Sequence, residues 1–130
     1  MTPWRPGRIP EAHPQRPRLQ LDGSVLYVTG VDIGSASSKA LILEKGEVVE
    51  HAILPTGAES VGSAERVMEM VLRQAGLELE EIRSVVSTGY GRIIVPFADE
   101  EMTELSCHAR GAHRLFPEAR TVLDMGGQDC

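Results

Sequence analysis

The sequence feature that most constrains the fold is residues 25–46, VLYVTGVDIGSASSKALILEKG, in which two apolar segments flank a turn of glycine and serine. Apolar runs of this length, bounded by turn residues, are typical of β-strands. Three strands are expected, at residues 25–33, 39–43 and 48–54. The Lys45-Gly46 pair turns the chain between the last two, so the three strands are predicted to form an antiparallel meander.

The first turn of this meander has the composition of an anion site. Gly34 lacks a Cβ, so the backbone can approach a phosphate oxygen closely. Residues 35–38 (SASS) can direct N–H groups and hydroxyls into one concavity. Asp32 is placed to hold a hydrated magnesium ion, and Lys39 supplies a positive charge near the phosphates. An ordinary β-hairpin with a flexible turn is the alternative, and the letters match neither the Walker A nor the Rossmann glycine pattern.

Beyond the meander, residues 60–75 carry apolar side chains at helical spacing. We expect Ser60 to cap this helix and Gly76 to end it. A fourth strand over residues 82–87 follows the helical crossover and is predicted to lie parallel to the first. It ends in a glycine-rich turn at residues 88–92 (TGYGR), whose arginine offers donors to a phosphate, a carboxylate or a partner protein. A plain strand-to-helix connection with a surface arginine is the alternative.

A second helix is predicted over residues 100–116, capped near Asp99 and ended by Pro117, with an apolar stripe facing the core. The stripe comprises Met102, Leu105, Ala109, Ala112 and Phe116. Cys107, His108 and His113 invite a metal interpretation. Neighbouring positions on a helix point about 100° apart, however, which disfavours a shared ion.

The end of the chain repeats the pattern of its beginning. Residues 120–123 start a short apolar strand, which ends in the acid-and-glycine turn of residues 124–129 (DMGGQD). The letters LDMGG resemble VDIGS at residues 31–35. Two such turns suit a two-domain clamp in which each lobe offers one phosphate-binding loop, although two independent strand ends would look similar. The predicted fold class is α/β, with a mixed sheet of four to five strands and two helices.

Composition narrows the remaining possibilities. The 130 residues fit a single domain or part of one, and no apolar run approaches the length of a membrane span. The net charge of −6 argues against a nucleic-acid surface. Five of the eight prolines lie in residues 1–23, which we expect to form a disordered arm. Without an apolar leader, the chain is expected to be cytoplasmic.

Four ordered blocks closely resemble the ATPase activators of 2-hydroxyacyl-CoA dehydratases and the ATPase subunits of benzoyl-CoA reductase, the BadF/BadG/BcrA/BcrD family. The blocks are GVDIGSASSKALIL at 30–43, STGYGR at 87–92, TELSCHARGA at 103–112 and TVLDMGGQD at 121–129. The resemblance implies the ribonuclease-H-like fold of actin-like ATPases. It also implies a homodimer that holds a 4Fe-4S cluster and uses ATP and Mg²⁺ to pass one low-potential electron to a CoA-ester dehydratase or reductase.

Carried over by motif, two phosphate loops are implied. The first comprises Asp32, Gly34, Ser35, Ala36 and Lys39, and the second comprises Asp124, Gly126, Gly127 and Gln128. Asp32 would hold magnesium through water, and Asp124 or Gln128 would position magnesium or the attacking water, as phosphoryl transfer requires. The family often has Thr at position 36, so Ala36 removes one hydroxyl from the first loop.

Family members continue well beyond the GGQD motif and carry both cluster-ligating cysteines in that later part, so this chain is expected to hold no cluster ligand. We therefore expect an arm over 1–23, a nucleotide-binding lobe over 24–117, and the first strand and phosphate loop of a second lobe over 118–130. Such an amino-terminal fragment is expected to bind nucleotide weakly and to be inactive as an ATPase on its own.

Two other functions fit the same sequence motifs. One is a lobe of a small-molecule kinase such as a sugar kinase, which a substrate-binding aspartate in the second lobe would identify. The other is a non-catalytic interaction module, which would bind a dehydratase partner without dependence on ATP.

Overall fold

The computed structural model describes residues 25–127, so the proline-rich arm and Gln128 lie outside the described residues. Its centre is a five-stranded mixed sheet in the order β3-β2-β1-β4-β5. The strands are β1 (Tyr27–Ile33), β2 (Ser37–Glu44), β3 (Glu47–Pro55), β4 (Ile82–Thr88) and β5 (Glu100–Glu101). β1, β2 and β3 form an antiparallel meander, whereas β4 is parallel to β1 and β5 is parallel to β4. The expected α/β class, meander and parallel fourth strand are confirmed.

The β2–β3 hairpin is closed by Lys45 and Gly46, with φ values of 50° and 83°. Positive φ at both central residues is the conformation that matches the right-handed twist of a two-residue hairpin. This explains why the Lys-Gly pair marked the turn in the sequence.

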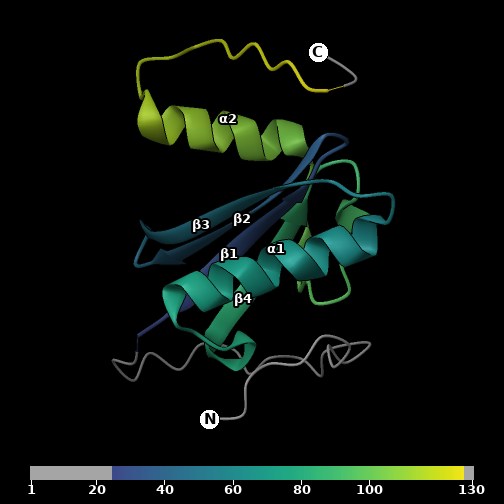
Figure 1. The fold of residues 1–130 in the computed structure, drawn as a ribbon. Helices are drawn as coiled ribbons and strands as arrows, with labels where there is room; N and C mark the ends of the chain where they lie inside the picture. Colours follow the sequence, from purple (N-terminus) through teal and green to yellow (C-terminus); the bar gives the residue numbers. More distant parts are fainter. Residues whose placement is uncertain (1–24, 128–130) are drawn as a thin grey trace.

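Helix α1 (Ser60–Ala75) packs across one face of the sheet (Figure 1) and supplies a third of the buried core residues. Its buried residues include Ala64, Val67 and Val71, which meet Val31 and Ile42 from the sheet in one apolar cluster. Burial of these side chains at helical spacing on α1 and at alternate positions on β1 and β2 fixes the register of both elements.

The two ends of α1 differ in how well the sequence predicted them. Gly76 ends the helix as expected, with φ 68° and an N–H bond to the Arg73 carbonyl. Ser60 does not cap the start: the N-cap residue is Glu59, which makes no side-chain cap bond. The buried Ser63 hydroxyl instead accepts from Gly57 N–H at 2.9 Å and donates to the Glu59 carbonyl at 3.0 Å, which ties the residues before the helix to its first turn.

The predicted start of the second helix is wrong. Helix α2 runs over Glu104–Leu115, and its N-cap is Thr103, whose hydroxyl accepts from Ser106 N–H. Asp99 does not cap a helix, because its backbone N–H and carboxylate bond to Val85 on β4 at 2.8 and 2.7 Å. These bonds extend the chain alongside β4, so residues 100 and 101 become β5.

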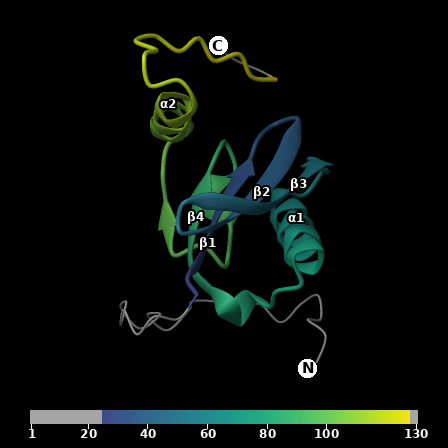
Figure 2. The same cartoon turned by 90° about the vertical axis from the view of Figure 1, so that its left-hand side faces the viewer.

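The predicted buried stripe of α2 is also wrong, because no residue of this helix is buried. α2 lies on the opposite side of the sheet from α1, as the two views in Figures 1 and 2 show. Leu105 and Phe116 are 73% and 66% exposed. Helical periodicity correctly predicts an amphipathic helix, but burial also needs a facing apolar surface, and the described residues provide none for this stripe.

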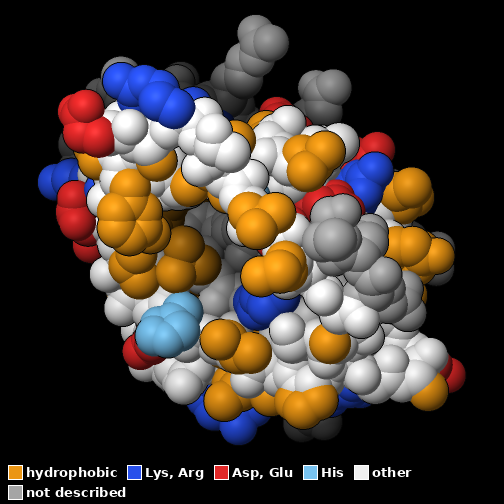
Figure 3. All heavy atoms as spheres, turned by 90° about the horizontal axis from the view of Figure 1, so that it is seen from above, with side chains coloured by type: hydrophobic (Ala, Val, Ile, Leu, Met, Phe, Trp, Pro, Cys, Tyr) orange, Lys and Arg blue, Asp and Glu red, His pale blue; other side chains and the backbone are white. Residues whose placement is uncertain are grey.

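Residues 120–123 form no strand; they run as an extended segment along the far side of α2 (Figure 2). A strand needs a neighbour for its backbone groups, and this segment pairs with none of the described strands. Hydrophobic side chains surround a hollow on the face that α2 and this segment share (Figure 3). The exposed hydrophobic residues of α2 and this segment include Leu115, Val122, Leu123 and Met125. None of the helices in residues 25–127 is long and apolar enough to span a membrane.

Candidate functional site

The predicted phosphate loop follows β1, where Asp32 and Lys39 face each other. They are direct cross-strand partners of β1 and β2, so their side chains lie on the same face of the sheet. Lys39 Nζ donates to Asp32 Oδ2 at 3.0 Å, and the two side chains are 42% and 23% exposed. The carboxylate is thus held in place by an ammonium group that remains open to solvent and to an added anion.

In the loop between them, the two central amides have no partner among the described residues. Gly34 N–H bonds to the Ser37 carbonyl at 3.0 Å and closes the turn, so this amide is not available to a phosphate. Among the described residues, the N–H groups of Ser35 and Ala36 donate no hydrogen bond, and both residues are exposed. Two adjacent free amides at a glycine turn form the kind of nest that binds anions.

Thr56, the residue directly after β3, supports this loop, a role that the sequence did not predict. Its hydroxyl donates to the Gly34 carbonyl at 2.8 Å, and its N–H donates to the Ala36 carbonyl at 3.0 Å. Ser38, predicted to add a hydroxyl to the nest, is fully buried and bonds to Thr56 Oγ1 at 2.9 Å instead. The sequence signal for this role is a polar residue directly after β3, the strand that pairs with β2.

The second glycine turn, residues 88–92, packs against the end of β1. Gly89 has φ 87°, and a Cβ there would collide with Asp32 Oδ1 and lie 2.6 Å from the Ile33 carbonyl oxygen. Gly91 N–H donates to the Ile33 carbonyl at 2.9 Å. Both positions need glycine because the turn and the β1 backbone approach closely. The parallel pairing of β4 with β1, which the sequence predicted, brings both turns to the same end of the sheet.

Thr88 adds an unsatisfied group to the site. Its hydroxyl is buried and has no hydrogen-bond partner in the part of the chain that the structure describes. Thr88 pairs in register with Asp32 across β4 and β1, so both side chains lie on the same sheet face. Leaving a buried hydroxyl unpaired costs free energy, and such groups call for an explanation in terms of a missing partner.

The second predicted loop comes up against the first. A Cβ added at Gly127 would lie 3.0 Å from Ser35 Oγ and 3.1 Å from Ala36 Cβ. The two acid-and-glycine motifs, more than ninety positions apart in the sequence, therefore meet at the end of β1. Gly126 immediately precedes this contact and is exposed.

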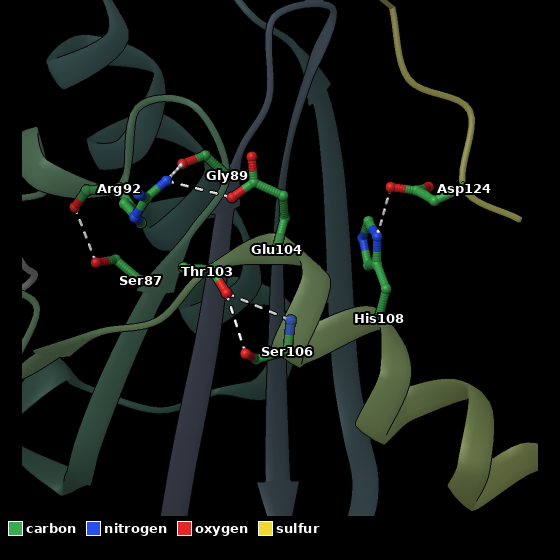
Figure 4. Close-up of polar contacts among 8 residues, drawn as sticks. All are labelled: Ser87, Gly89, Arg92, Thr103, Glu104, Ser106, His108 and Asp124. Atoms are coloured by element: carbon green, nitrogen blue, oxygen red, sulfur yellow. Dashed lines mark hydrogen bonds and ion pairs between the residues drawn. The ribbon is translucent and has the colours of Figure 1, made fainter. Parts of the chain in front are cut away.

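Helix α2 contacts the turn at residues 88–92 and the segment that carries Asp124 through one face (Figure 4). Arg92 Nη1 bonds to the Gly89 carbonyl at 3.1 Å and to Glu104 Oε2 at 3.2 Å, so its donors serve an internal carboxylate. One helical turn later, His108 Nδ1 lies 2.9 Å from Asp124 Oδ2. In the described part of the chain, no group of three or more His, Cys, Asp or Glu side chains could hold a metal ion.

The architecture defines the class of protein. A meander followed by a parallel β4 across a helical crossover, with loops gathered at the end of β1, is the ribonuclease-H-like fold of actin-like ATPases. A hexokinase of the ROK class from Thermus thermophilus aligns with 69% of this chain and 38% of its own, with a TM-score of 0.52 and 18% identity. This similarity shows the fold alone.

The sequence matches the BadF/BadG/BcrA/BcrD ATPase family over residues 29–130, and the chain belongs to this family. It is 46% identical to the 2-hydroxyisocaproyl-CoA dehydratase activator of Clostridioides difficile over 106 residues, which are 81% of this chain and 40% of that protein. The solved activator of the 2-hydroxyisocaproyl-CoA dehydratase from Clostridium difficile, with bound ADPNP, aligns with a TM-score of 0.75 and 43% identity, covering 79% of this chain and 38% of its own. The chain spans about 40% of the length of the curated relatives it matches.

Proposed function

We propose that residues 25–127 form the nucleotide-binding part of an ATP-dependent activator, which in its complete form passes an electron to a CoA-ester dehydratase or reductase. The observation that carries the proposal is the contact of Gly127 with Ser35 and Ala36 beside Asp32 and Lys39. Two phosphate-type loops at one end of a sheet are what a polyphosphate between two lobes requires. The kinase alternative finds support in the fold alone.

The residues of the site fit a magnesium-bound polyphosphate. Ser35 and Ala36 offer free amides, Lys39 offers an exposed ammonium, and Asp32 offers a fixed carboxylate. Mg²⁺ keeps several waters and needs only one or two carboxylates, so the absence of a three-ligand cluster among the described residues is compatible with it. The unpaired Thr88 hydroxyl on the same face would accept or donate to a hydrated ion. When bound, the ion supplies charge stabilisation at the phosphates.

On this assignment, the chain's own residues would bind the phosphates and orient the magnesium ion or the attacking water. The free amides would hold phosphate oxygens, and Lys39 would partition between the phosphates and Asp32. Asp124, placed by its loop, would orient magnesium or the attacking water, which is the contribution on which phosphoryl transfer depends most. Gln128, the second residue proposed for this role, lies outside the described residues.

An iron–sulfur cluster does not fit the described residues. A 4Fe-4S cluster is usually held by four Cys thiolates, and Cys107 on α2 is the cysteine that residues 25–127 contain. It has no neighbouring metal-ligating group there. The proposed electron transfer, the homodimer and the dehydratase or reductase partner therefore concern an assembly larger than this lobe.

The test is calorimetric titration of the 130-residue chain with Mg-ADPNP. We expect a Kd of roughly 0.1–1 mM, because part of the contacts of a two-lobed site are made. Lys39→Gln should weaken binding about fivefold through loss of one phosphate-facing charge.

Lys45→Gln is the matched control, since it removes the same charge at the opposite end of β2 and should leave the affinity unchanged. No binding at millimolar nucleotide, or equal effects of the two substitutions, would refute the proposed site. Submicromolar binding would refute the view that this lobe is half of a site.

A further inference from the structure

His108 and Asp124 connect α2 to the segment that carries the second glycine loop. His108 Nδ1 lies 2.9 Å from Asp124 Oδ2, and the two side chains are 42% and 41% exposed. Figure 4 shows the imidazole ring directed at the carboxylate across the gap between helix and segment. Asp124 is half-buried, whereas the residues on either side of it are exposed.

The contact defines which ring nitrogen carries the proton. A carboxylate can only accept hydrogen bonds, so Nδ1 of His108 must be the donor. Nδ1 is attached to Cγ of the ring, close to the backbone. A hydrogen bond through this nitrogen therefore holds the Asp124 carboxylate close to the backbone of α2.

The helix that carries His108 is itself anchored to the first half of the site. Glu104 lies four positions earlier and therefore on the same helix face. It bonds to Arg92, which also holds the Gly89 carbonyl of the turn packed on Asp32. At its other end, α2 is tied to the β2–β3 hairpin by Arg114, which donates to the Gly46 carbonyl at 2.7 Å. α2 is thus fixed to the sheet at both ends.

We propose that His108 is a positioning residue for Asp124: its Nδ1–H holds the carboxylate, and α2 transmits the position of the turn at residues 88–92, which packs on Asp32, to the loop that carries Gly127. The proposal rests on the proposed nucleotide function. It explains why the loop bearing Gly127 stays against Ser35 and Ala36 although its segment pairs with none of the described strands.

The first test needs no nucleotide. In the ¹⁵N-labelled 130-residue chain, His108→Ala should move the amide resonances of Ser35, Ala36 and Gly127. His113→Ala, at an exposed position on the same helix, is the matched control and should leave them in place. His108→Asn should restore the resonances because the Asn amide nitrogen occupies the Nδ1 position, whereas Gln reaches one bond too far and should not.

The second test is Mg-ADPNP titration of the same variants. We expect His108→Ala and His108→Gln to weaken binding by about three- to tenfold, the effect of losing a half-exposed hydrogen bond to a charged group. His108→Asn and His113→Ala should bind as the unaltered chain does. A helix that merely lost stability would not separate Asn from Gln in this way.

The two tests separate the positioning role of His108 from the proposed nucleotide function. Unmoved Ser35 and Ala36 resonances in His108→Ala would overturn the positioning role, and so would moved resonances with unchanged nucleotide affinity. Failure of the unaltered chain to bind millimolar Mg-ADPNP would refute the proposed function, while the resonances would still decide whether His108 holds the loop.

Discussion

Thr88→Val should make the protein more stable and a worse nucleotide binder at the same time. The Thr88 side chain is 9% exposed, and its hydroxyl has no partner within residues 25–127. A buried polar group without a partner costs about 1–3 kcal/mol. Valine keeps the branched shape and removes the hydroxyl, so the free energy of unfolding should rise by about 1 kcal/mol. For a domain of this size, that corresponds to a Tm increase of roughly 4 °C.

The effect on binding has the opposite sign. If the hydroxyl completes its hydrogen bonding with a hydrated magnesium ion or a phosphate beside Asp32, valine removes one contact worth about 1 kcal/mol. Mg-ADPNP affinity should then fall about fivefold. Urea unfolding and calorimetric titration of the same preparation measure the two quantities independently.

Thr29→Val is the matched control. The Thr29 hydroxyl is likewise buried and without a partner among the described residues, but alternation along β1 places it on the same side as Val31, the face that α1 covers. This substitution should raise stability by a similar amount and leave Mg-ADPNP affinity unchanged. A less stable Thr88→Val protein would refute the orphaned hydroxyl, and an unchanged affinity would refute its place in the nucleotide site.

Two further predictions concern the turn at residues 88–92. Gly89→Ala should lower the unfolding free energy by at least about 2 kcal/mol, because φ 87° strains an L-residue and the new Cβ collides with Asp32; Gly30→Ala, whose Cβ would meet nothing within 4 Å, should cause no loss. A double-mutant cycle of Arg92→Ala and Glu104→Ala, followed by urea unfolding, should give a coupling of about 0.5–1 kcal/mol, as expected for a half-exposed pair. Additive effects would show that the ion pair does not anchor α2.

Most of the sheet could be predicted from the sequence because local patterns decide it. Alternating apolar residues specify β1 and β2, and the Lys45-Gly46 pair supplies the positive φ values that a tight hairpin needs. The helical period of α1 and the glycine after it define that helix without reference to the rest of the chain. The parallel direction of β4 followed from the helical crossover between it and the first three strands, and it brings two glycine turns to the end of β1.

The predictions that were wrong concern residues whose structure depends on contacts with distant parts of the chain. Asp99 was predicted to cap a helix because acids do so commonly, yet a bond to Val85, fourteen positions away, draws it into the sheet edge. The stripe of α2 has the right spacing for burial, but burial depends on a facing surface that spacing does not report. Residues 120–123 have strand composition and no strand to pair with among those described.

The sequence by itself determined the β1–β3 meander, α1 and β4, and which residue types could bind a phosphate, because these depend on neighbours along the chain. Tertiary structure alone decided which amides of the loop are free, that Thr56 supports it, and that His108 reaches Asp124. The contacts of Thr56 and of His108 join residues 16 or more positions apart. Their partners are set by how helices and strands pack, which one-dimensional spacing does not encode.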